Sequence, residues 1–135
     1  MMQETEEGFL AKALESLEGA QSEFDRGRYN NCANRCYFGA FQAAIHALVR
    51  AGIQPPGGPE GRWGHAFVQA QFAGQLVNRR KLYAPEFRDT LNDNMVLRRR
   101  ADYRVQQVTE THAARALRRT RDFLNAIRGG GGETT

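Results

Sequence analysis

Three consecutive arginines open the stretch that is richest in chemically useful side chains, RRRADYR at residues 98–104. Arg98 and Asp102 are four residues apart, so on a helix they share one side and can form an ion pair. A guanidinium is also well suited to bind phosphate, because it offers several N–H donors in a rigid planar fork. The stretch therefore predicts either an ion-paired structural contact or part of a site for a phosphate-bearing ligand.

One histidine is placed where it could assist such a site. His65 lies in WGHAFVQAQF, at the start of an expected helix. The N-terminus of a helix favours anions, and an imidazolium there would add to that preference. The alternative is a helix-start histidine with no chemistry. The other two histidines, His46 and His112, are interpreted as surface or interface residues.

Apolar residues recur at intervals of three and four along the chain, which predicts helices and no strand. The expected elements are a first helix with a stripe from Phe9 to Phe24, a second from Tyr29 to Leu48, a third from about Trp63 to Lys81, a fourth carrying Phe87, Leu91 and Met95, and a fifth capped by Thr109. The second helix is the richest in small residues and should be the most buried. Short connections then predict an all-α, antiparallel bundle of four to five helices. Residues 1–128 would form this single domain, and 129–135 a disordered glycine-rich tail.

The inward stripe of the fourth helix changes character along its length. It steps from Leu91 and Met95 to Arg98, Asp102 and Val105, so a guanidinium and a carboxylate follow hydrocarbon. Burying a charge costs several kcal/mol unless the group is paired and hydrogen-bonded. We therefore expect a structural or a functional reason for this polar inner surface.

Charge is distributed unevenly. Residues 1–30 hold seven acids against three bases, whereas residues 98–128 hold nine arginines against three acids. This asymmetry favours an acidic partner such as nucleic acid. The alternative is that the many arginines reflect a GC-rich genome.

The remaining composition excludes several classes of protein. Cys32 and Cys36 are one helical turn apart in an apolar stretch and are interpreted as buried apolar side chains, so no metal site is expected. No cofactor is expected either, because no glycine-rich phosphate loop is present. No apolar run approaches the ~20 residues that span a bilayer. The acidic start, MMQETEEGFL, is unlike a signal peptide, so a cytoplasmic location without membrane contact is expected.

Three motifs, in this order, resemble the HEPN domain, a small all-helical module of bacteria and archaea. They are Tyr37–Phe38–Gly39 on the second helix, His65 with Val68 and Phe72 on the third, and Arg98, Ala101, Asp102 and Tyr103 on the fourth. The resemblance spans roughly residues 8–128 and implies a bundle that often dimerises. It also implies association with nucleotide or RNA, and pairing with a minimal nucleotidyltransferase in toxin–antitoxin or defence modules.

Many members of that family are metal-independent ribonucleases with an arginine, four to six further residues, and then a histidine. This chain departs from that pattern. No histidine follows Arg98, Arg99 or Arg100 at that spacing, and seven residues separate Arg104 from His112. Whether the chain is an enzyme therefore stays open.

Three hypotheses follow for the function. The first is a nucleotide- or RNA-binding module, acting as a homodimer or with a nucleotidyltransferase, whose binding residues would be Arg98, Asp102, Tyr103, Arg100, Arg104, Tyr37 and Arg35. The second is a ribonuclease toxin whose catalytic pair, Arg98 and His65, assembles in space. The third is a purely structural interaction subunit.

Overall fold

The computed structural model describes residues 2–130, with side chains from residue 8 onward, and in this part of the chain all regular secondary structure is helical. Its elements are α1 (Met2–Asp25), α2 (Tyr29–Arg50), α3 (His65–Gln71), the π-helix η1 (Phe72–Arg79), the 3₁₀ turn η2 (Pro85–Phe87), α4 (Thr90–Tyr103) and α5 (Glu110–Arg128). Most of the tail expected to be disordered, residues 131–135, lies outside the described residues.

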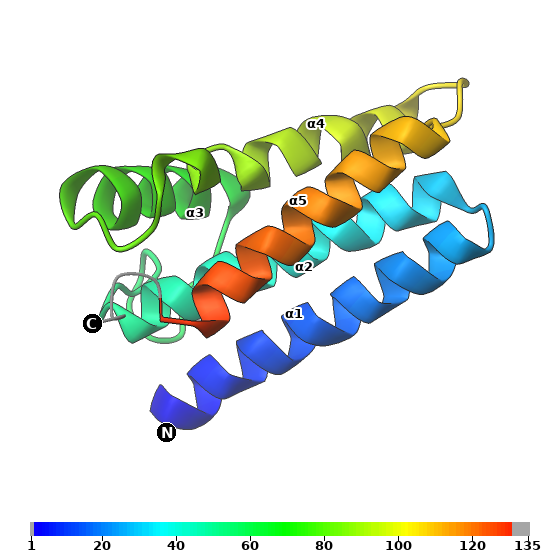
Figure 1. Ribbon diagram of the computed structural model, residues 1–135. Coiled ribbons are helices and arrows are strands. Elements are labelled where there is room, and N and C mark those ends of the chain that lie inside the picture. The colour runs from blue at the N-terminus through cyan, green and yellow to red at the C-terminus, as the bar shows by residue number, and fades with distance from the viewer. Residues whose placement is uncertain (1, 131–135) are drawn as a thin grey trace.

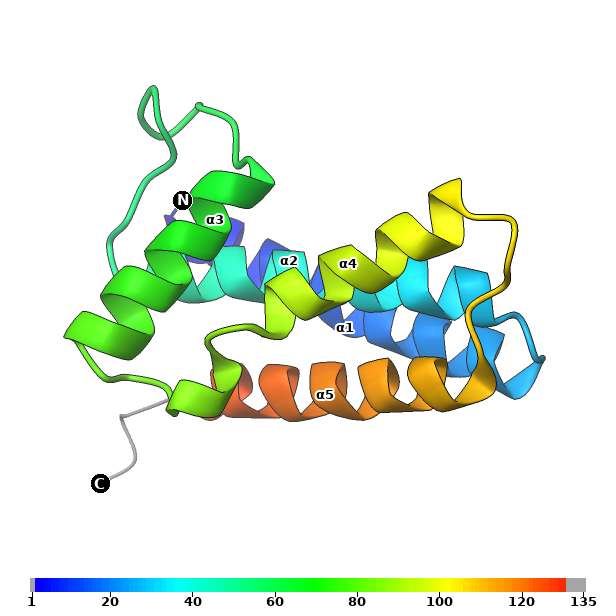
Figure 2. The same ribbon diagram turned by 90° about the horizontal axis from the view of Figure 1, so that it is seen from above.

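The long helices form an antiparallel bundle. Helices α1 and α4 run in one direction, and α2 and α5 run in the other (Figure 1). Helix α2 contacts every other α-helix, while α3 and η1 lie across one end of the bundle (Figure 2). The prediction of an all-α, antiparallel bundle is therefore confirmed.

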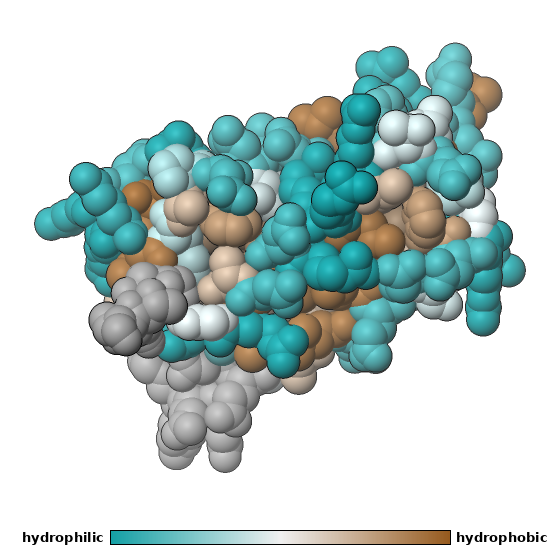
Figure 3. Space-filling view, viewed as in Figure 1, coloured by the Kyte–Doolittle hydropathy of each residue, from teal (hydrophilic) through white to brown (hydrophobic). Residues whose placement is uncertain are grey.

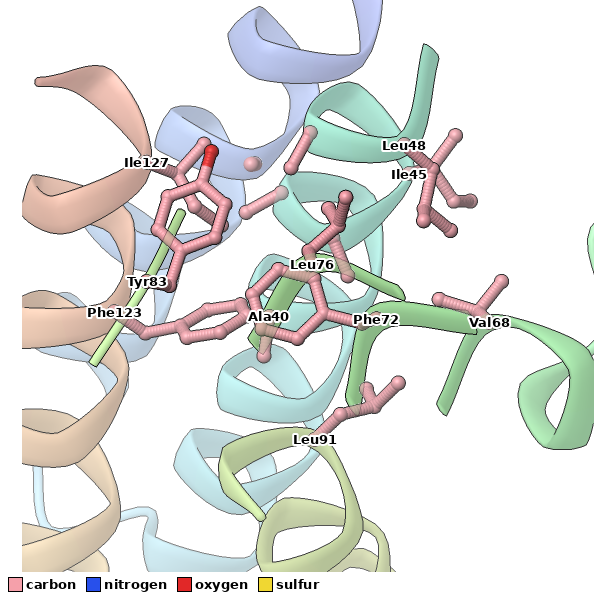
Figure 4. Packing of buried hydrophobic residues seen from close by; sticks show 14 of the residues in the cluster. Ala40, Ile45, Leu48, Val68, Phe72, Leu76, Tyr83, Leu91, Phe123 and Ile127 are labelled. Carbon is pink, nitrogen blue, oxygen red and sulfur yellow. The ribbon is translucent and has the colours of Figure 1, made fainter. Parts of the chain in front are cut away.

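The core has two parts, and α2 contributes to both. In the larger part, the Phe72 ring stacks on Tyr83 at 5.3 Å between centroids and tilts against Phe123 at 5.1 Å (Figure 4). The smaller part holds Cys32 and Cys36, which are both buried and unoxidised, as expected. Burial of these apolar side chains is what fixes α2 at the centre of the bundle.

Helix boundaries differ from the sequence prediction in the middle of the chain. Trp63 precedes the third helix, because Gly64 has an extended backbone and α3 begins at His65. Phe87 belongs to the 3₁₀ turn that Pro85 begins, and α4 starts only at Thr90. A proline suits the first turn of a helical segment. Pro85 therefore marks a real helix start, but the start of the short 3₁₀ turn and not of α4.

Two further expectations were wrong, and one was confirmed. Val105 is fully exposed rather than inward, because α4 ends at Tyr103 and Arg104 has an extended backbone. His46 is buried rather than at the surface, because other helices surround this half of α2. The predicted cap of α5 is present, since the Thr109 hydroxyl accepts a hydrogen bond from the His112 backbone N–H. No helix within residues 2–130 has the length and apolar character that a bilayer crossing requires.

Candidate functional site

The Arg98 side chain lies against two aromatic rings of α2. Its Cζ atom is 5.0 Å from the centroid of the Tyr37 ring and 4.9 Å from that of the Phe38 ring. The two rings meet edge to face, with their centroids 5.2 Å apart. A guanidinium over aromatic faces is attracted by their negative π-surface, so these rings hold Arg98 at the α2–α4 contact.

Asp102 joins Arg98 one turn later on α4, as the spacing predicted. Oδ2 of Asp102 is 3.4 Å from Nε of Arg98, and both side chains are about 30% exposed, at 29% and 30%. Its other oxygen, Oδ1, accepts a hydrogen bond of 3.0 Å from the Asn34 amide on α2. The carboxylate therefore holds α4 to α2 and also balances part of the guanidinium charge.

The Arg98–Asp102 contact is an ion pair without a well-formed hydrogen bond. Nε of Arg98 is buried, and among the described residues it has no acceptor in hydrogen-bonding geometry. Its separation of 3.4 Å from the carboxylate is beyond the usual range of such bonds. Buried donors are nearly always satisfied, so this one is an exception, and the carboxylate of Asp102 compensates it only by charge.

His65 reaches the same cluster through Tyr37. The Tyr37 hydroxyl is 3.1 Å from Nδ1 of His65, and the two rings are 5.7 Å apart. Burial lowers the pKa of His65; Asn92 opposes this by hydrogen bonding, and nearby arginines add to it. Burial raises the pKa of Tyr37, and the positive charges of Arg98 and Arg99 partly offset this by lowering it. Near neutral pH, Tyr37 is therefore protonated and His65 is uncharged.

The structure brings together some of the residues expected in the site and separates others. Tyr37, His65, Arg98 and Asp102 form one cluster at the meeting of α2, α3 and α4. Tyr103 follows at the end of α4 and is 83% exposed. The other three expected residues lie outside this cluster.

Arg100 contacts His112 of α5, on the opposite side of α4 from Arg98. Arg104 is exposed beyond the end of the helix. Arg35 borders a hollow of about 460 Å³ between α1 and α2, which Asn34 and Phe38 also line. Arg100 and Arg104 therefore lie away from the Arg98 cluster, whereas Arg35 adjoins it through this hollow.

Three contributors to the cluster were not predicted as site residues, although one of them, Phe38, belongs to the Tyr37–Phe38–Gly39 motif. Phe38 supplies the second ring under Arg98, Asn34 binds Asp102, and Asn92 hydrogen-bonds to His65. Asn34 precedes Tyr37 by three residues, a spacing that places both on one side of a helix, so a local signal existed. Asn92 had no comparable signal, because its contact is with another helix.

The cluster is chemically suited to bind an anion. It offers a partly exposed guanidinium with one unsatisfied N–H, held over two rings. It also holds a neutral imidazole, which can accept a proton, next to a protonated phenol. A phosphate group could bind the guanidinium while a base stacks on an exposed aromatic side chain.

Comparisons with known proteins agree with the motifs. Among curated proteins, a sequence search finds no match to this chain. The family comparison, by contrast, matches residues 7–130 to the HEPN domain. That match covers nearly the whole described bundle, including all the residues of the Arg98 cluster. The chain therefore belongs to the HEPN domain family.

Proposed function

We propose that the protein is a nucleotide- or RNA-binding module whose primary contact is the Arg98 guanidinium. One observation carries this proposal: the Arg98 guanidinium is held over two aromatic rings while its side chain stays 30% exposed. An anionic oxygen could bind the solvent-accessible part of this guanidinium, and a charge-assisted hydrogen bond of this kind contributes about 1.5–3 kcal/mol. Membership of the HEPN family supports a nucleotide- or RNA-related role.

Tyr103 and Phe38 support the choice of a nucleic-acid ligand over a simple anion. Both are large aromatic residues with exposed side chains: Phe38 lies under Arg98, and Tyr103 ends α4, five residues after Arg98. Stacking of a base on an aromatic side chain contributes about 1–3 kcal/mol. A phosphate on Arg98 and a base on Tyr103 would together suit a single-stranded RNA segment.

The binding experiment uses fluorescence anisotropy with a labelled single-stranded RNA, and separately with a labelled ATP, at two salt concentrations. Arg98→Ala should weaken binding about tenfold or more, since one charge-assisted hydrogen bond is lost. Arg128→Ala is the matched control, because it removes the same charge from an exposed position in the last turn of α5. Equal losses in the two variants, or no binding by the wild type at low salt, would exclude the Arg98 site.

We further propose that the module is a homodimer and works with a minimal nucleotidyltransferase in a toxin–antitoxin or defence system. Exposed apolar side chains support an interface at α4: Val96, Tyr103 and Val105 are all on α4 or just beyond it. Light scattering after size exclusion should give twice the chain mass. Co-purification with the nucleotidyltransferase encoded nearest to this gene tests the second partner. A protein that stays monomeric and does not co-purify with the nucleotidyltransferase would contradict both proposals.

A ribonuclease is the second candidate, and the Tyr37 bridge is the observation that favours it. Tyr37 contacts both His65 and Arg98, so a proton acceptor and a phosphate-binding group share one neighbour. In such an enzyme, neutral His65 would take the proton of the 2′-hydroxyl as its oxygen bonded to phosphorus, while Arg98 stabilised the charge on the phosphate. The P–O5′ bond would break, and a water molecule would protonate the leaving 5′-oxygen. Incubation with RNA should then give cleavage that is lost in His65→Ala but not in His46→Ala. Intact RNA with the wild type would leave the binding module as the proposal.

A further inference from the structure

A second cluster of basic side chains lines a groove between α4 and α5. The groove has a volume of about 260 Å³, and the polar residues that border it are Asp93, Arg100, His112, Arg115 and Arg119. In the view of Figure 3, hydrophilic side chains gather over α4 and α5. Arg100 lies two positions after Arg98, which is about 200° around a helix, so this groove and the Arg98 cluster are on opposite sides of α4.

Arg119 is held in this groove by a buried amide. Nε of Arg119 donates a hydrogen bond of 3.0 Å to Oδ1 of Asn94, which is fully buried. The Asn94 amide nitrogen donates in turn to the Cys36 carbonyl at 3.2 Å and to the Thr120 hydroxyl at 2.8 Å. With both ends of Asn94 engaged, the guanidinium is fixed through Nε, and this bond does not use its two terminal amino groups.

Arg100 and His112 form a second fixed pair across the groove. Nη1 of Arg100 is 3.2 Å from Nδ1 of His112. A guanidinium can only donate, so Nδ1 of His112 is the acceptor in this contact. His112, Arg115 and Arg119 are spaced by three and four residues on α5, which places them on one side of that helix. Both pairs therefore present N–H donors from two helices to the same space.

The charge balance of the groove calls for an anion. Three guanidinium groups border it against the single carboxylate of Asp93. Like charges close together repel each other. Arg100 and Arg119 are nevertheless held at the groove by specific hydrogen bonds. The volume is below the roughly 300–1,000 Å³ of pockets that enclose a drug-sized ligand, so it suits one phosphate group rather than a whole nucleotide.

We propose that the α4–α5 groove binds a phosphate group, as a second anion site on the other side of α4 from Arg98. For the identity of the ligand this rests on the proposed function: the phosphate comes from an RNA backbone or from a free nucleotide. An RNA strand that crosses α4 would place one phosphate at Arg98 and another in the groove. A mononucleotide would use the groove alone.

The experiment measures binding of a labelled single-stranded RNA and of ATP to full-length variants, each over a series of salt concentrations. Arg100→Gln and Arg115→Gln should each weaken RNA binding about fivefold to tenfold and reduce the salt slope by about 1, as expected for a lost phosphate contact. Arg118→Gln is the matched control, since Arg118 is exposed on the same helix and does not border the groove. It should change the affinity by less than about twofold.

Arg119→Gln also disturbs Asn94, so Arg115→Gln is the variant that leaves the buried hydrogen bonds intact. Thermal unfolding of each variant shows whether a loss of binding is only a loss of folding. A weaker affinity for ATP in the same variants would identify a free nucleotide as the ligand, and unchanged ATP affinity with weaker RNA binding would identify the RNA backbone.

Two results would overturn the proposal. One is an equal loss in Arg118→Gln, which would mean diffuse charge rather than a site. The other is unchanged binding in Arg100→Gln and Arg115→Gln together with weaker self-association, which would mean a protein contact. The Arg98 site is tested separately by Arg98→Ala. If only Arg98→Ala weakens binding, the groove proposal fails; if only the groove variants weaken binding, the Arg98 site fails.

Discussion

Replacement of Arg98 by methionine should destabilise the fold by about 1–2 kcal/mol, mainly through the two aromatic contacts. Each cation–π contact is worth about 0.5–1 kcal/mol at a site that is still partly exposed, and Arg98 makes two, at 5.0 and 4.9 Å. The ion pair with Asp102 adds no more than about 0.5 kcal/mol, because both side chains are partly solvated and lie one helical turn apart. Methionine keeps the packing of the aliphatic stem, so the difference reports the charge.

Urea unfolding followed by circular dichroism measures this loss. With a slope of about 2 kcal/mol per molar urea, the midpoint should fall by about 0.5–1 M. Asp102→Asn should cost less than about 0.5 kcal/mol, because an asparagine still offers Oδ1 to Asn34 and only the ionic part is lost.

Double-mutant cycles separate the two kinds of contact. The coupling energy of Arg98→Met with Phe38→Leu should exceed that of Arg98→Met with Asp102→Asn. Added salt should reduce the Asp102 coupling more, since screening acts on solvated charges. The reasoning would be refuted by a larger coupling to Asp102 than to Phe38, because that would make the carboxylate, and not the rings, the group that positions Arg98.

Two further predictions concern the framework of both sites. Asn94→Leu removes three hydrogen bonds from a fully buried position, one of them to a guanidinium, and should cost about 3 kcal/mol in urea unfolding; a loss under about 1 kcal/mol would show that the network is not needed. Because the folded pKa of His65 is lowered below the ordinary value of about 6.5, its contribution to stability is complete above that pH and is lost as the pH falls through the lowered pKa. His65→Gln should therefore flatten the acid limb of the stability profile, and parallel profiles of the two proteins would contradict this.

Periodic burial made the overall bundle predictable from sequence. The stripe of α2 continues through its small and apolar residues without a break, and burial of that helix follows directly. The Thr109 cap and the Arg98–Asp102 pair were also predictable, because both depend on residues three or four positions apart. Contacts of this kind are encoded locally, so the spacing of residues along the chain is enough to predict them.

Contacts between helices were not predictable in the same way. Arg100 and His112 are separated by a helix end, a loop and the next cap, and no pattern in the sequence announces that they meet. Burial of His46 depends on how many neighbours surround α2, which periodicity along α2 alone does not contain. The inward position expected for Val105 failed for a related reason, since the end of α4 comes before it.

Asn94 is the intermediate case. It lies three residues after Leu91 and three before Leu97, on the side of α4 that is buried, so its burial could be inferred from spacing. Its partners could not, because they belong to α2 and α5. A buried amide in such a stripe predicts a hydrogen-bonded network without naming the network.

Helix α4 is positioned by polar contacts as well as by apolar burial. Two of its four buried residues, Thr90 and Asn94, are polar, and Asp102 and Arg98 add an amide contact and a pair of ring contacts to α2. Polar contacts at a helix surface are weaker than core packing and are sensitive to what else binds there. A helix held in this way responds to an anion on either side, because the same guanidinium groups that would bind phosphate also hold the helix. An RNA strand that engaged both sides of α4 would therefore stabilise the bundle as it bound, and occupancy of one site would favour the other.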